Sequence, residues 1–104
     1  MSFDRQKQVN QLLAREIAAL LPRFFSTKRF GMMTITNVRT AKNFDSVKVR
    51  ISVSRNAHQF YGDAKRHIFQ IQKIINSQLT MKKVPKIIFE LNQNTDLLEK
   101  LEQL

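Results

Sequence analysis

The fold is decided by the stretch Val47-Lys48-Val49-Arg50-Ile51-Ser52-Val53, in which apolar and polar residues alternate strictly. Alternate residues of a strand point to opposite faces of a sheet, so this stretch predicts a strand with one apolar face in the core. Lys48 and Arg50 then lie on the solvent face, unless helices cover it. Residues 32–40 are rich in β-branched side chains and predict a preceding strand. Asn43 and Asp45 supply turn chemistry between the two, which favours an antiparallel hairpin.

Two amphipathic helices are predicted around this hairpin. Apolar residues recur at helical spacing from Val9 to Leu21, and Pro22 predicts that the first helix ends or bends there. Residues 23–30 are expected to form a basic, aromatic connector that Gly31 closes. The second helical pattern covers residues 58–79 and is long enough for two helices with a bend between them.

A third strand is predicted after Pro85, with Ile87, Phe89 and Leu91 on its core face. Leucines at positions 97, 98, 101 and 104 predict a short C-terminal helix, which either closes the core or docks on a partner. The predicted order is helix–strand–strand–helix–(helix)–strand. It indicates an α+β fold with helices on one face of a three-stranded sheet.

The charge of the chain is unusual for its size. Its 104 residues suit one domain, yet they carry 18 Lys and Arg against 8 Asp and Glu, a net charge of +10. Residues 1–86 hold 17 of these cations and four of the acids, a net charge of +13, whereas residues 87–104 are acidic. A basic body of this kind predicts a polyanionic partner.

Several classes of function are disfavoured by the composition. The chain has no cysteine and two glycines, so thiolate chemistry and glycine-rich phosphate loops are excluded. His58 and His67 are nine residues apart, which places them on opposite sides of a helix and disfavours a shared metal ion. We therefore expect neither an enzyme nor a cofactor. No apolar run approaches the roughly 18 residues of a membrane span.

The element order resembles that of the type II KH domain, an RNA-binding fold. Three motifs are similar to those of bacterial ribosome-binding factor A. They are Gly31-Met32-Met33-Thr34-Ile35-Thr36-Asn37-Val38, the alternating stretch 47–53, and Met81-Lys82-Lys83-Val84-Pro85-Lys86-Ile87-Ile88-Phe89. One departure is that the family's Ala-x-Gly bend falls at His67-Ile68-Phe69, without a glycine. This departure favours a continuous or differently bent helix.

The resemblance implies a non-enzymatic protein that binds the free small (30S) ribosomal subunit and its rRNA in the cytoplasm. It would assist subunit assembly and late 16S rRNA maturation, with other assembly factors as further partners, and we expect a monomer. Residues 1–92 would form the KH-like RNA-binding domain, and residues 93–104 a short helical tail.

Candidate RNA-binding residues are the basic side chains that can neutralise phosphates. Arg66 and Lys73 share one helix face, with Lys65 at its edge. Phe69 lies beside them, where it can stack on a base, unless a bend in the helix turns it into the core, which is the interpretation we favour from sequence. The full candidate set is Lys82, Lys83, Lys86, Arg66, Lys73, Lys65, Arg5, Lys7, Lys48 and Arg50.

Three other functions remain open on the sequence. The first is a general KH-type binder of single-stranded RNA or DNA. The second is a protein-interaction module that uses the C-terminal leucines. The third is a small enzyme, which would need His58 or His67.

Overall fold

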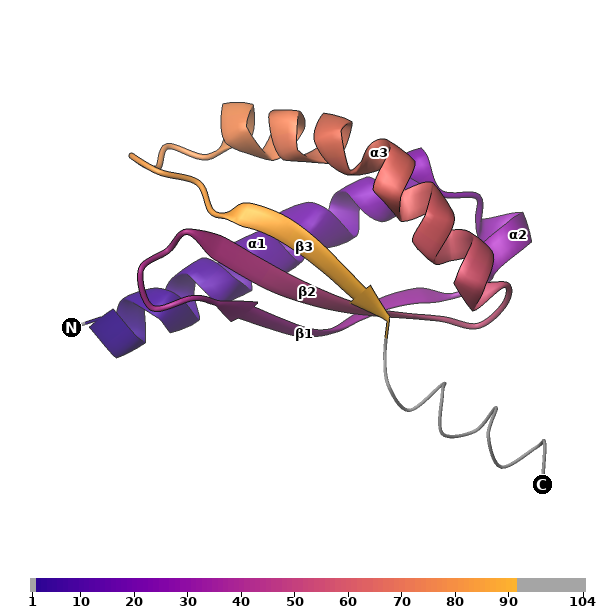
Figure 1. Cartoon of the computed structure of the whole chain (residues 1–104), viewed down its shortest axis with the longest axis horizontal. Coiled ribbons are helices and arrows are strands. Elements are labelled where there is room, and N and C mark those ends of the chain that lie inside the picture. The colour runs from indigo at the N-terminus through magenta and orange to yellow at the C-terminus, as the bar shows by residue number, and fades with distance from the viewer. Residues whose placement is uncertain (1, 92–104) are drawn as a thin grey trace, which may run out of the picture.

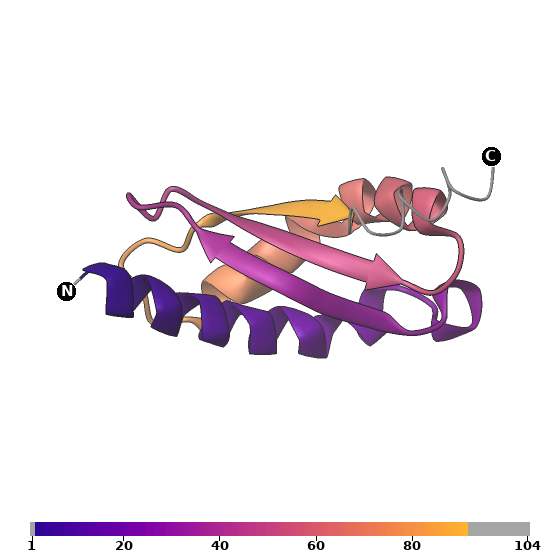
Figure 2. The ribbon, with the colours of Figure 1, turned by 90° about the horizontal axis from the view of Figure 1, so that it is seen from below.

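The structure is a computed structural model that describes residues 2–91 of the chain, with side chains from residue 5 onward. Two long helices and a three-stranded sheet make up its architecture (Figures 1 and 2). The elements in chain order are α1 (Ser2–Phe24), α2 (Thr27–Phe30), β1 (Met33–Thr40), β2 (Ser46–Val53), α3 (Ala57–Gln78) and β3 (Lys86–Leu91). This confirms the expected α+β, type II KH-like order for the described part of the chain.

The central strand of the sheet is β2, which pairs antiparallel with β1 and parallel with β3. A parallel neighbour needs a crossover connection, and α3 supplies it. The turn between β1 and β2 is closed by the side chain of Asn43, whose Oδ1 accepts the backbone N–H of Asp45 at 3.1 Å. The register of the β1–β2 pair shifts between Ile35 and Asn37 of β1, as at a β-bulge.

The core lies between one face of the sheet and the two long helices. The alternation in β2 works as predicted, because Val47, Val49 and Ile51 are fully buried. The apolar stripes of α1 and α3 meet this face with side chains that include Ile17 and Ile71. The opposite face of the sheet carries no helix in the described part of the chain (Figure 2). Lys48 is therefore exposed to solvent, while Arg50 is half-buried.

An aromatic cluster closes the core at the end where α2 lies. The rings of Phe25 and Phe60 have centroids 4.5 Å apart, and Phe30 meets Phe60 edge to face at 5.2 Å. The half-buried His67 packs its imidazole against Phe25, with ring centroids 5.6 Å apart. The phenylalanines of the predicted connector are thus packing anchors.

Three local expectations about helices need correction. First, α1 runs through Pro22, because a proline in the last turn of a helix removes only one hydrogen bond. Leu21 is buried, and its backbone carbonyl accepts the N–H of Phe25 at 2.9 Å, which keeps the last turn in place. Second, part of the predicted connector forms α2, whose start is capped by Ser26. Its Oγ accepts the N–H of Arg29 at 3.2 Å.

Third, α3 is one unbroken helix rather than two helices, which confirms the continuous or bent helix expected from the missing glycine at residues 67–69, and its axis changes direction near the middle (Figure 1). The bend does not turn Phe69 into the core, and its side chain is 79% exposed, so the interpretation that buried it was wrong. The predicted C-terminal helix lies outside the described residues, and the proposed domain boundary at residue 92 falls at their edge and stays a prediction.

Candidate nucleic-acid interface

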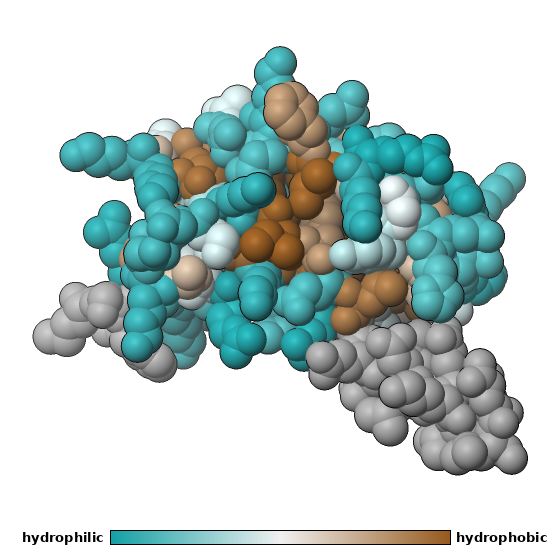
Figure 3. Space-filling view, viewed as in Figure 1, coloured by the Kyte–Doolittle hydropathy of each residue, from teal (hydrophilic) through white to brown (hydrophobic). Residues whose placement is uncertain are grey.

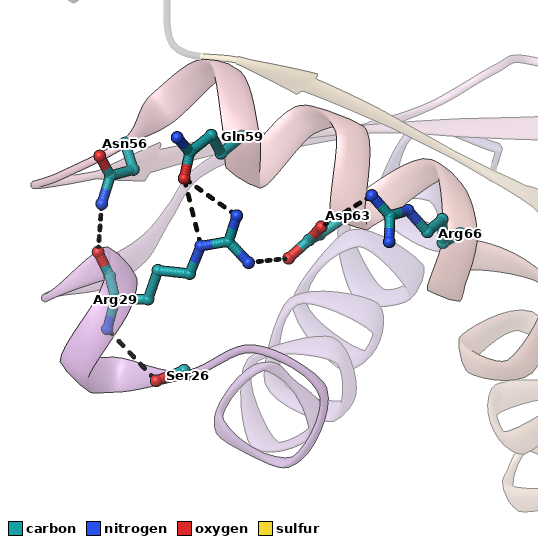
Figure 4. A network of polar contacts seen from close by, with 6 residues as sticks. All are labelled: Ser26, Arg29, Asn56, Gln59, Asp63 and Arg66. Atoms are coloured by element: carbon teal, nitrogen blue, oxygen red, sulfur yellow. Dashed lines mark hydrogen bonds and ion pairs between the residues drawn. The ribbon is translucent and has the colours of Figure 1, made fainter.

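One basic residue of the predicted connector, Arg29, has a structural task. Arg29 donates from Nε and Nη2 to Oε1 of Gln59, at 3.2 and 2.9 Å, and from Nη1 to Asp63 at 3.2 Å (Figure 4). The same network includes Asn56, which donates to the backbone carbonyl of Arg29 at 2.7 Å. This clamp joins α2 to α3 and uses the guanidinium of Arg29 within the protein. Arg66 contributes weakly, at 3.8 Å from Asp63.

Other basic residues gather at the opposite end of the molecule. This end, which we call the basic end, holds the N-terminal half of α1, the β1–β2 turn and the loop before β3 (Figure 1). It contains two grooves, one on each side of the turn. The structure thereby brings most of the predicted basic residues together, from segments far apart in the sequence.

The first groove, here called the basic groove, lies between α1 and the ends of β1 and β2. It has a volume of about 620 Å³, and four cations line it: Lys7, Arg39, Lys42 and Lys48. Its other lining residues are uncharged: Gln6, Asn10, Thr40, Ala41 and Ser46. Four positive side chains, with no acid among the described residues of the lining, form a site that favours an anion.

The sheet itself places like charges next to one another at this groove. Arg39 of β1 and Lys48 of β2 are paired in the antiparallel register. Lys86 of β3 pairs with Ser46, two residues along β2 from Lys48, and is exposed as well. Like charges directly opposite one another destabilise a sheet, so the arrangement costs stability in the free protein. A bound polyanion would remove that cost.

The second groove lies on the other side of the turn and has a volume of about 460 Å³. Arg5, Lys82 and Lys83 line it, and the guanidinium of Arg5 sits 5.7 Å from the ring centroid of Phe44. Lys83 forms an ion pair with Asp45, so part of its charge is compensated within the protein. Arg5 and Lys82 form no ion pair with any other described residue, so their charges are available to a ligand.

The remaining predicted residues lie elsewhere. Lys65, Arg66 and Lys73 project from α3, away from both grooves, and all three are exposed. Arg50 lies on the outer face of β2, where the parallel register pairs it with Glu90. Its Nε is buried without a hydrogen-bond partner in the described structure. The set named from sequence thus divides into the basic end, the α3 cations and the isolated Arg50.

Sequence reasoning missed Arg39 and Lys42, which both line the basic groove. The position of Arg39 could have been found from sequence. If the predicted hairpin is closed by the turn around residues 42–46, Arg39 of the first strand lies opposite Lys48 of the second. Lys42 was hidden in the turn, where a charged residue is ordinary. Among the described side chains, residues 5–91, no three or more His, Cys, Asp or Glu residues form a group that could hold a metal ion.

The fold and its charged surface define a small basic protein of the type II KH-like class. A sequence profile described as ribosome-binding factor A matches residues 5–104, nearly the whole chain. The chain belongs to the ribosome-binding factor A family. A curated relative, ribosome-binding factor A of Bdellovibrio bacteriovorus, is 26% identical over 103 residues, which cover 96% of this chain and 77% of the relative.

Solved structures agree with this assignment at the level of the fold. The crystal structure of ribosome-binding factor A from Thermus thermophilus has a TM-score of 0.64 and 19% identity, and the match covers 88% of this chain and 94% of the other. A homology model of the Thermus thermophilus factor, fitted into a cryo-EM map of a 30S–RbfA complex, has a TM-score of 0.66 and 19% identity. That match covers 86% and 93% of the two chains.

Proposed function

We propose that this protein binds the free small ribosomal subunit and assists its assembly and late 16S rRNA maturation. The observation that carries the proposal is the basic groove, where Arg39 and Lys48 are paired across the sheet and none of the described lining residues is an acid. Folded rRNA offers the dense phosphate charge that such a surface needs. Membership of the ribosome-binding factor A family supports the same partner, as does the relative that was fitted into a map of a 30S complex.

The proposed mechanism is non-catalytic and takes place in the cytoplasm. The basic end docks as a rigid surface on folded rRNA and favours the rRNA conformation that fits it until the protein dissociates. Phosphate contacts of this kind fix position and orientation rather than reading bases. No helix among residues 2–91 is long and apolar enough to cross a membrane.

Co-sedimentation tests the proposal. The protein should sediment with free small subunits more strongly than with whole ribosomes, and its attachment should weaken steeply as KCl is raised, because counterions compete for the phosphates. Equal attachment to both particles, or none, contradicts the assembly role. Short single-stranded oligonucleotides serve as competitors: if they bind as tightly as subunits do, the general KH-type function is the better description.

A further inference from the structure

The outer surface of α3 carries alternating aromatic and basic residues that the basic end does not explain. Tyr61, Lys65, Phe69 and Lys73 follow one another at intervals of four residues. Residues four apart on a helix lie ~6 Å apart along its axis and ~40° apart around it, so the four side chains form one continuous ridge. We call this the α3 ridge.

Phe69 lies between Lys65 and Lys73 on the ridge and is exposed to solvent. Its side chain is 79% exposed, the largest exposure among the exposed large apolar side chains of the described residues. Lys65 precedes it by one step of the ridge and Lys73 follows by one step. The space beside Gly62, one residue from Tyr61, is open, since a Cβ there would meet nothing within 4 Å.

The ridge borders a shallow apolar hollow between α3 and β3. Tyr61, Lys65, Ile68 and Ile88 contribute to its lining, and its volume is about 200 Å³. The space-filling view shows apolar side chains in this hollow, with hydrophilic side chains around them (Figure 3). The Nζ of Lys65 lies 4.8 Å from the ring centroid of Tyr61, so cation and aromatic ring already contact each other along the ridge.

The charge of the ridge indicates which partner it fits. Asp63 is the one acid of α3, and it is turned toward Arg29 in the clamp to α2. The ridge therefore presents flat apolar rings between positive charges. An unpaired nucleotide has the complementary pattern, with a flat base between phosphates, and aromatic rings between basic residues are typical of surfaces that bind single strands.

We infer that Phe69 stacks on an unpaired base of RNA while Lys65 and Lys73 hold the phosphates on either side. The inference rests on the proposed function, and it assigns to α3 a second contact that differs in kind from the basic end. The basic end binds phosphates of folded rRNA by charge. The α3 ridge binds a single-stranded segment, and its central contact is neutral.

The chain contains no tryptophan, so F69W introduces one fluorescent reporter at the site. Titration of the F69W protein with oligouridine should quench its fluorescence, because a stacked base contacts the indole. The matched control is M32W, since Met32 is 75% exposed, precedes β1 and has no part in the ridge. Its fluorescence should stay unchanged at the same oligonucleotide concentration.

Affinity measurements with F69A complete the test. Loss of one stacked base should weaken binding to oligouridine by about tenfold, while the dependence of affinity on KCl stays the same, because the lost contact carries no charge. F69W should retain the affinity, and the melting temperature of F69A should match that of the unmodified protein. Unchanged affinity of F69A together with unquenched F69W overturns the inference.

A second arm separates this inference from the proposed function. If F69A loses affinity for whole small subunits but not for protein-free 16S rRNA or oligouridine, the ridge binds a ribosomal protein, and the inference is wrong. If oligouridine quenches the fluorescence of F69W but the unmodified protein does not sediment with small subunits, the proposed function fails while the stacking contact stands.

Discussion

Asn10 and Thr40 are joined by two hydrogen bonds, since Oδ1 of Asn10 accepts the backbone N–H of Thr40 at 2.9 Å and its hydroxyl at 2.6 Å. Thr40 is 4% exposed, the buried polar residue of the described core. Gln6 adds a hydrogen bond from its Nε2 to the carbonyl of Thr40 at 3.1 Å. These contacts fasten α1 to the last residue of β1, and all three residues line the basic groove.

The N10A substitution should therefore lower the free energy of unfolding by about 1–3 kcal/mol, because it leaves two donors of Thr40 without their acceptor. Urea denaturation measures the change. N10D keeps an acceptor at the same place and should cost less than N10A. Q11A, at an exposed position of the same helix, is the control. Alanine favours the helix at both positions, so a loss in Q11A equal to that in N10A would show that the effect does not come from the hydrogen bonds to Thr40.

The two glycines of the chain should respond in opposite ways to alanine. Gly31 has φ 71° and ψ −137°, and a Cβ there would lie 2.0 Å from Oγ of Ser54. G31A should thus destabilise the protein by more than ~1 kcal/mol, because alanine is strained at this positive φ and its Cβ would clash with the side chain of Ser54. G62A lies within α3 with open space around it and should stabilise by about 0.5–1 kcal/mol. Thermal melts of both variants check this, and a shift in the same direction for both contradicts it.

The hairpin and the core were predictable because period-2 alternation is a local pattern that fixes both structure and orientation. Val47, Val49 and Ile51 could face only one way once residues 47–53 formed a strand. Whether residues 58–79 form one helix or two was less predictable. Whether a helix of 22 residues breaks or merely bends depends on its packing against the sheet, and the same uncertainty decided whether Phe69 was buried or exposed.

The candidate site was predicted in its residue types but not in its grouping. Single charges such as Lys7 and Lys48 were identified, yet their meeting in one groove depends on how α1 crosses the end of the hairpin. Arg29 shows the reverse problem. It has the charge of an RNA-binding residue, and only the positions of Gln59 and Asp63 on α3 reveal that it holds two helices together.

R29A should accordingly reduce stability and leave RNA binding almost unchanged. Three hydrogen bonds from a half-exposed guanidinium are lost, and solvent screening limits the cost to about 1 kcal/mol. R29K should not restore the stability, because an ammonium cannot reproduce the planar fork that reaches Gln59 and Asp63 together. Urea denaturation measures the first effect and co-sedimentation with small subunits the second. A loss of subunit binding with unchanged stability would instead place Arg29 in the interface.

Charge reversal in the basic groove gives the most direct measure of its role. Lys42 is an exposed residue of the β1–β2 turn, so K42E should fold normally while it introduces an acid among Lys7, Arg39 and Lys48. Binding to free small subunits should weaken, and the slope of log K against log [KCl] should decrease in magnitude by about 1 as one phosphate contact is lost.

The matched control for K42E is K28E, which makes the same change in net charge at an exposed residue of α2, at the far end of the molecule. Because exposed charges more than about 10 Å apart are largely screened at 0.1 M salt, K28E should leave the salt slope unaltered. Equal weakening by both variants would mean that the subunit senses only the total charge of the protein. A selective effect of K42E assigns the phosphate contact to the groove between α1 and the hairpin.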